Sequence, residues 1–121
     1  MSTVVEKQTE TVFKHHLEAF GAKDIDAVME DFTEDSVVIE SMAPEAAHGL
    51  AAIRAFFTQA MEGFTPEVLT SIKVHRLEVH GEVAYMVWSA GEAFPFATDT
   101  FVIRNGTIVA KTAAAYLPQD G

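Results

Sequence analysis

Residues 31–57, DFTEDSVVIESMAPEAAHGLAAIRAFF, decide how the chain is organised. They contain the end of a short helix, a turn, the strand SVVIE at 36–40, an irregular loop over 41–48 with room for a short edge strand, and the start of a helix. Strands rich in valine and isoleucine are normally buried on at least one face. The strand ends in Glu40, so this carboxylate is either exposed to solvent or held in a pocket.

The composition limits the class of protein. A chain of 121 residues suits one domain, so we expect a single domain over residues 1–121. Its 18 acidic residues against 8 lysines and arginines give a formal net charge of −10, which disfavours nucleic-acid and membrane partners. No apolar run is long enough to span a bilayer. The absence of cysteine and of a signal-peptide pattern favours a cytoplasmic location.

Three N-terminal helices are predicted from apolar residues at helical spacing. The first covers 3–20 and ends at Gly21. The second starts at Asp24, a good N-cap residue, and the third covers roughly 50–62, closed by Gly63 and Pro66. The apolar stripes of the three helices contain Phe13, His16, Leu17 and Phe20; Ile25, Val28, Met29 and Phe32; and Leu50, Ile53, Phe57, Ala60 and Met61. His16 is the polar exception at the centre of the first stripe.

From residue 67 the pattern changes to four strands that form an antiparallel meander. The first two are joined at His80-Gly81, and a change of phase near His75-Arg76 predicts a β-bulge. Asn105-Gly106 predicts the hairpin between the strand over 94–104 and the strand over 107–117. The strands at 83–90 and 107–117 are apolar on both faces. Helices can cover only one face of the sheet, so we expect the other face to meet a second subunit in a homodimer.

The segments LEAFGAKDIDAVMEDFTEDSVV, HGLAAIRAFF and DTFVIRNGTIVAK, together with this order of elements, resemble the nuclear transport factor 2-like superfamily, with its SnoaL-like and ketosteroid isomerase-like branches. The resemblance covers about residues 10–117. It implies an α+β fold in which a curved, mixed and mostly antiparallel sheet wraps around the three helices as a cone. It also implies an apolar cavity open at one end and agrees with a homodimer.

The resemblance assigns three site residues. Glu40 matches the acidic base of ketosteroid isomerases, and Asp99 matches their aspartate in a D-x-F strand before an N-G turn. His16 stands where those enzymes carry a tyrosine. Apolar neighbours disfavour the charged form of a carboxyl group, so a protonated Asp99 would donate a hydrogen bond to a developing oxyanion. Glu40 would remove a proton from the adjacent carbon, and His16, neutral or cationic, would be the second donor.

The sequence therefore predicts cofactor-independent acid–base catalysis, an isomerase or cyclase reaction by enolisation, on a small apolar carbonyl compound. The alternative is a binding module that holds an apolar ligand or mediates association without turnover. The residues expected to contact the ligand are Phe20, Phe57, Met61, Trp88 and Phe101. Histidine spacing typical of metal sites is absent, so no metal or other cofactor is expected. Limonene epoxide hydrolase-like catalysis would need an arginine between two acids, and Arg54, Arg76 and Arg104 are expected to face outward or lie at the rim.

Overall fold

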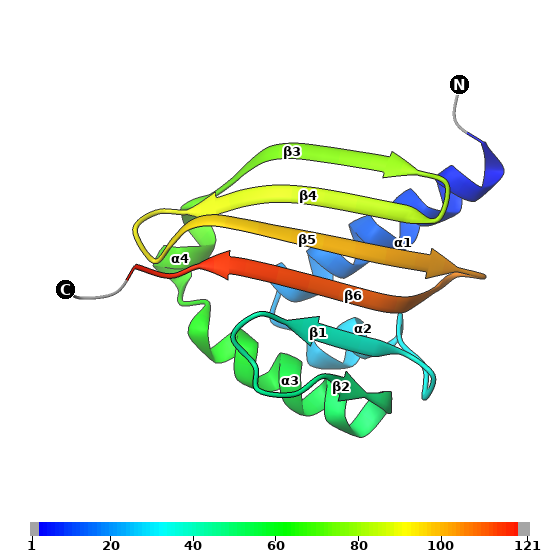
Figure 1. Cartoon of the computed structure of the whole chain (residues 1–121), viewed down its shortest axis with the longest axis horizontal. Coiled ribbons are helices and arrows are strands. Elements are labelled where there is room, and N and C mark those ends of the chain that lie inside the picture. Colours follow the sequence, from blue (N-terminus) through cyan, green and yellow to red (C-terminus); the bar gives the residue numbers. More distant parts are fainter. Residues whose placement is uncertain (1–2, 119–121) are drawn as a thin grey trace.

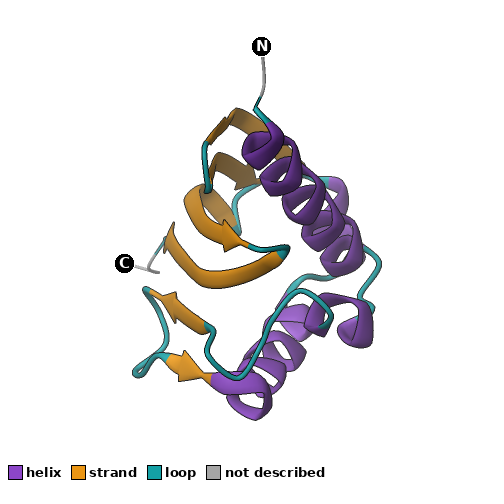
Figure 2. Ribbon diagram, turned by 90° about the vertical axis from the view of Figure 1, so that its right-hand side faces the viewer, coloured by secondary structure: helices purple, strands orange, loops and turns teal. Residues whose placement is uncertain are grey.

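The computed structural model describes residues 3–118, which form an α+β fold with helices on one side of a six-stranded sheet (Figures 1 and 2). This confirms the predicted fold class. The helices are α1 (Val4–Gly21), α2 (Ile25–Met29), α3 (Gly49–Gly63) and α4 (Pro66–Thr70). The strands are β1 (Val37–Glu40), β2 (Ala47–His48), β3 (Ile72–His80), β4 (Val83–Ala90), β5 (Phe94–Arg104) and β6 (Thr107–Tyr116).

The sheet is mixed but mostly antiparallel, with the strand order β2-β1-β6-β5-β4-β3. Strands β3 to β6 form the predicted antiparallel meander. Strand β1 lies parallel to β6, although the two are far apart in the sequence, and β2 is an antiparallel edge strand on β1. The last strand of the meander is therefore flanked by β5 on one side and by β1 on the other (Figure 1).

Local sequence signals explain where several elements begin and turn. Thr3 and Glu6 form a reciprocal capping box at the start of α1. Asn105 and Gly106 have φ values of 52° and 79°, the backbone that a tight hairpin between twisted strands requires. The predicted β-bulge is present, because the pairing of β3 with β4 shifts by one residue between Val74 and Arg76.

The number of helices differs from the prediction. Pro66 was expected to close the third helix, but it begins the additional helix α4, whose N-cap Thr65 accepts a hydrogen bond from the backbone N–H of Val68. Proline favours the first turn of a helix because its missing N–H has no partner there anyway. Helix α2 is short and ends at Met29, although Phe32 beyond it is buried as predicted. Leu50 is more than one-third exposed, in contrast to its place on the predicted buried face of α3.

The sheet is strongly curved, and the helices face its concave side (Figure 2). Side chains alternate between the two faces, so Ala84, Met86 and Trp88 of β4 point inward and are buried. On the convex side a row of paired residues crosses four strands, from Tyr85 through Thr100 and Thr112 to Ile39. No helix formed by residues 3–118 covers this convex face (Figure 2). None of the helices described is long and apolar enough to span a membrane.

Candidate active site

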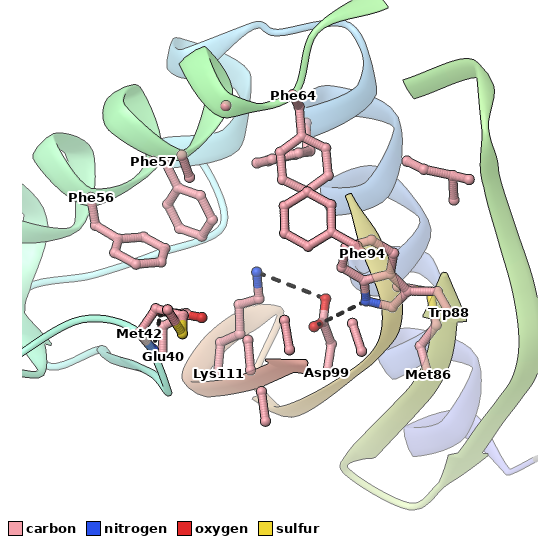
Figure 3. A pocket seen from close by; sticks show the side chains of 18 of the residues that line it. Glu40, Met42, Phe56, Phe57, Phe64, Met86, Trp88, Phe94, Asp99 and Lys111 are labelled. Carbon is pink, nitrogen blue, oxygen red and sulfur yellow. Dashed lines mark hydrogen bonds and ion pairs between the residues drawn. The ribbon is translucent and has the colours of Figure 1, made fainter. Parts of the chain in front are cut away.

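A cavity of about 800 Å³ lies between the concave face of the sheet and helices α1, α3 and α4 (Figure 3). Its floor consists of short side chains, because Ala97 pairs with Ala115 across β5 and β6, and Ala113 is the next residue of β6 on the same face. A methyl group does not reach the helices above it, so the space remains open. Met42 and Ile72 line the cavity and are themselves exposed, which places them at its mouth. The aromatic walls are formed by Phe20, Phe56, Phe57, Phe64, Trp88 and Phe94.

Glu40 lines this cavity, at the last residue of β1. Its Oε2 accepts a hydrogen bond of 2.6 Å from the backbone N–H of Met42, and its Oε1 accepts a longer one of 3.4 Å from the Ser41 hydroxyl. These bonds turn the chain after β1 and orient the carboxylate. The acid predicted to lie either in solvent or in a pocket is half-buried on the pocket wall.

Asp99 lies on the opposite side of β6 from Glu40. Both acids are in register with Ala113, one from β5 and one from β1. Adjacent strands are about 4.8 Å apart, so the two acids start from backbone positions roughly 10 Å apart. Only the methyl group of Ala113 stands between them on this row, which leaves space for a third group or for a ligand.

Asp99 has two polar neighbours. The indole Nε1–H of Trp88 donates a hydrogen bond of 3.3 Å to Asp99 Oδ1, and the ammonium group of Lys111 lies 4.0 Å from Oδ2 (Figure 3). An indole N–H only donates, so Asp99 is the acceptor of this hydrogen bond. Asp99 is thus not surrounded by apolar side chains alone, in contrast to the expectation from the sequence.

Lys111 is the functional group that the sequence analysis missed. It is on β6, only 7% exposed, and Figure 3 shows its side chain between Glu40 and Asp99. Nζ lies 4.9 Å from the ring centroid of Phe57 and 5.4 Å from that of Phe101. Burial lowers the pKa of Lys111, and the negative charges of Asp99 and Glu40 oppose this by raising it. Its only sequence signal is a single cation in the otherwise uncharged strand TIVAKTAAAY.

A β-bulge turns Lys111 into the cavity. Beyond the Asn105-Gly106 turn, Arg104 pairs with Thr107 and Ile103 with Ile108, but the register then shifts so that Val102 pairs with Ala110. If the register of the turn continued unchanged, Lys111 would pair with Thr100, which faces the convex side. The inserted residue instead pairs Lys111 with Phe101, which faces the concave side.

His16 projects from α1 into the same region and is 1% exposed. Its ring lies among the rings of Phe57 and Phe101, with centroids 5.5 and 5.1 Å away, and its Nδ1 has no hydrogen-bond partner among residues 3–118. Burial, followed by the positive charges of Lys111 and His15, lowers the pKa of His16 well below its usual value. The imidazole is therefore neutral, which decides between the neutral and cationic forms left open by the sequence.

The lowered pKa of His16 predicts a pH dependence of folding. Below pH 6.5 the unfolded chain binds a proton at His16 that the folded chain does not, so the free energy of unfolding falls as the pH falls, by up to about 1.4 kcal/mol per pH unit. We expect urea unfolding at pH 6.5 and 5.5 to show a smaller loss for His16→Phe than for the wild type. Equal losses would contradict a buried neutral His16.

His15 acts in the opposite direction but does not affect this comparison. A hydrogen bond to Asp31, 2.7 Å long, is the main cause that raises the pKa of His15. Its stabilising contribution is fully present below pH 6.5 and is lost as the pH rises through its folded pKa. Because His15 is present in both proteins, its contribution cancels in the difference between them.

Three of the five residues predicted to contact the ligand line the cavity, namely Phe20, Phe57 and Trp88. Met61 and Phe101 do not line it and are buried in the core instead. Phe101 still contributes indirectly, since its ring contacts both His16 and the ammonium group of Lys111. The helical and strand periodicities place all five side chains on inward faces. How deeply each side chain lies in the interior decides whether it lines the cavity or packs in the core.

The three arginines are exposed and do not line the cavity, as expected. Each forms an ion pair on the surface: Arg54 with Asp26, Arg76 with Glu78, and Arg104 with Glu82. The cation between the two cavity acids is Lys111. Within residues 3–118 no group of three histidine or acidic side chains lies close enough to hold a metal ion.

Comparison with known proteins identifies relatives in sequence and in structure. Residues 13–111 match the family model of the SnoaL-like domain. An NTF-2 like protein of unknown function from Burkholderia xenovorans LB400 is 19% identical, with a TM-score of 0.74 over 98% of this chain and 91% of the other. A comparison with curated proteins gave no match.

Two further solved structures carry names that refer to an activity. A candidate ketosteroid isomerase from Kribbella flavida DSM 17836 is 16% identical, with a TM-score of 0.68 over 95% of this chain and 84% of the other. An LEH-like epoxide hydrolase from M. tuberculosis is 14% identical, with a TM-score of 0.65 over 91% and 84%. At these identities the likeness establishes the fold alone.

Proposed function

Because the chain belongs to the SnoaL-like domain family, whose fold is shared by proteins named for isomerase and hydrolase activities, we propose that it is a cofactor-independent acid–base catalyst. The proposed reaction is an isomerisation or cyclisation by enolisation of a small apolar carbonyl compound. One observation carries this proposal: a single open, apolar cavity contains Glu40, Lys111, Asp99 and a neutral His16. The proposed location is the cytoplasm, since the chain has no cysteine.

Glu40 is the proposed base. It lies on the cavity wall, and its hydrogen bond from the Met42 N–H holds the carboxylate in place while its other oxygen retains only a weak 3.4 Å contact. It removes a proton from the carbon beside the carbonyl group and returns it to another carbon, which moves a double bond, or leaves the carbanion to attack elsewhere in the same molecule.

Lys111 and His16 are the proposed stabilisers of the enolate oxygen. Lys111 brings a positive charge into a site where apolar walls exclude water, which strengthens its interaction with a developing oxyanion. The neutral imidazole of His16 adds an N–H donor. Asp99 accepts a hydrogen bond from Trp88 and lies 4.0 Å from the ammonium group, so its proposed role is to position Lys111.

The cavity also indicates the class of substrate. A volume of about 800 Å³ falls within the range of small-molecule sites and accommodates more than one ring. The cavity contains two acids, Glu40 and Asp99, against one lysine, in a chain whose net charge is −10. This excess of acidic groups disfavours anionic substrates, so the proposed substrate is an uncharged ketone or aldehyde.

The test is deuterium exchange. A panel of apolar ketones and aldehydes in D₂O would be followed by proton NMR for exchange of the hydrogen beside the carbonyl group, with and without the protein. We expect exchange above the buffer rate for at least one compound, and inhibition by an apolar competitor without a carbonyl group. Tight binding of such compounds with exchange at the buffer rate would instead support the alternative function, a binding module.

A second candidate function is hydrolysis of an apolar epoxide to a diol, and one observation favours it: Lys111 lies between two acids (Figure 3). One carboxylate would activate a water molecule for attack on an epoxide carbon. The other acid, in its protonated form, would give a proton to the oxygen that becomes a hydroxyl group. Release of diol with one oxygen from ¹⁸O-labelled water would support this reaction over enolisation.

We further propose that two copies of the chain associate through the convex face of the sheet, where Tyr85, Thr100, Thr112 and Ile39 form one row. Thr112→Lys would place a charge at the centre of this face. We expect it to raise the dimer dissociation constant on the order of a hundredfold, because burying an unpaired charge costs a few kcal/mol. Sedimentation velocity measures the change, and Thr11→Lys on the exposed side of α1 is the matched control. A wild-type monomer at micromolar concentration would refute the proposal.

A further inference from the structure

We propose that Lys111 is a covalent catalytic group, whose Nζ condenses with the carbonyl carbon of an apolar aldehyde or ketone bound in the cavity to form an imine. The inference deepens the proposed function and relies on it for the class of substrate. It concerns the same cavity, but Lys111 forms a covalent bond with the substrate instead of acting only through its positive charge. The chain has five lysines, and Lys111 alone among them lines the cavity.

The first support is the position of Nζ. It lies beside the rings of Phe57 and Phe101, at 4.9 and 5.4 Å, and its nearest carboxylate oxygen, on Asp99, is 4.0 Å away. That separation is longer than a hydrogen bond, so the lone pair and protons of Nζ are not taken up by a direct hydrogen bond to Asp99. The cavity above Ala113 gives a carbonyl group room to reach Nζ.

The second support is the low polarity around the nitrogen. Burial lowers the pKa of Lys111, and although Asp99 and Glu40 act against this, the net direction is downward. Only the neutral amine is a nucleophile, and lysines that react with carbonyl compounds are activated by such desolvation. Lys7, Lys14, Lys23 and Lys73 are all exposed and lack this environment.

The third support is that acids flank the nitrogen and can move the protons that imine formation requires. The lone pair of Nζ attacks the carbonyl carbon, and the carbon–oxygen π pair moves to oxygen. The alkoxide takes a proton from solvent and becomes a hydroxyl group. Asp99 takes a proton from the nitrogen and gives it to this hydroxyl group, which leaves as water while the nitrogen lone pair forms the carbon–nitrogen double bond of a protonated imine. No oxidant or reductant is needed.

The imine then supports the proposed enolisation. Its nitrogen carries the positive charge that draws electrons from the neighbouring carbon, so Glu40 removes a proton to form an enamine. Glu40 and Lys111 approach from adjacent strands, since Val38 pairs with Lys111 and Glu40 follows two residues later on the same face. Reprotonation at another carbon and hydrolysis by water release the product and restore the amine.

The test is reductive trapping in the full-length chain. An aromatic aldehyde, 6-methoxy-2-naphthaldehyde, is incubated with the protein and sodium cyanoborohydride at pH 7, and the modified lysines are located by peptide mass spectrometry. We expect Lys111 to be labelled about tenfold or more faster than any exposed lysine, because the cavity holds the aldehyde beside Nζ and the amine there is desolvated. The aldehyde-free analogue 2-methoxynaphthalene should protect Lys111 and leave surface labelling unchanged.

Mapping on the unmodified chain makes the test independent of whether a variant folds. Lys111→Arg keeps the charge and should lose the label at this site, while Lys73→Arg is the matched surface control. Labelling spread evenly over the exposed lysines, or none on Lys111, overturns the inference. Deuterium exchange without a label on Lys111 would overturn it while leaving non-covalent enolisation intact. A label on Lys111 without exchange would support the imine and refute enolisation.

Discussion

Glu40→Gln is expected to reduce deuterium exchange, for any carbonyl compound that the wild-type protein enolises, on the order of a hundredfold or more. The amide has nearly the shape of the carboxylate but lacks a basic oxygen. Its carbonyl oxygen can still accept the hydrogen bond from the Met42 N–H, so the wall of the cavity is preserved. We therefore expect the dissociation constant of an apolar ligand, measured by fluorescence of Trp88, to change little.

The control is Glu45→Gln, an exposed acid in the loop after β1 that does not line the cavity. It should leave exchange unchanged. His16→Phe should cost less than Glu40→Gln, since it removes one N–H donor and leaves Lys111 in place. If Glu40→Gln exchanges as fast as the wild type, Glu40 is not the base, and Asp99 becomes the group to test.

The Lys111–Asp99 pair is expected to show strong energetic coupling. Asp99→Leu leaves a buried ammonium group without its nearest carboxylate, and Lys111→Met leaves a buried carboxylate with only the Trp88 N–H. We expect each single substitution to lower the free energy of unfolding by about 3 kcal/mol, at the lower end of the range for buried pairs because the cavity admits water. Urea unfolding at pH 7 measures the change.

The double variant Lys111→Met, Asp99→Leu removes both charges and keeps apolar side chains of similar size. It should regain most of the lost stability, because replacing a whole buried ion pair with apolar groups is far less costly than removing one partner. If the two single losses simply add in the double variant, the groups are not coupled, and Asp99 does not stabilise the charge of Lys111.

Much of the fold could be predicted because its signals are local. A capping residue, a helical stripe or an Asn-Gly pair acts within a few residues, and the structure confirms the start of α1, the hairpin after Arg104 and the bulge near Arg76. Alternation along β5 places Ala97, Asp99, Phe101 and Ile103 on one inward face, where Asp99 is 8% exposed. His16 is likewise buried, as its place in the apolar stripe of α1 indicated.

Only the tertiary structure decided that Lys111 lies in the cavity beside Asp99. Whether Lys111 faces the cavity depends on the bulge that shifts β6 against β5 after Ile103, and a one-residue shift reverses the face of every side chain beyond it. No pattern within TIVAKTAAAY specifies that shift, because the register is set jointly by two strands and by the packing of their buried side chains. For the same reason the sequence did not indicate that Asp99 has a lysine and an indole N–H as neighbours.

The cavity itself is also a tertiary property. Local periodicity indicated that His16 and Asp99 face inward, because side-chain direction follows from it, but it left open whether Glu40 lies in solvent or in a pocket. Which of them surround open space was decided by distance across the fold: Ala97, Ala113 and Ala115 are too short to meet the helices, whereas Met61 and Phe101 are long enough to be buried in the core. The cavity remains where the side chains of the sheet and of the helices do not meet. No single stretch of sequence contains both the sheet side and the helix side.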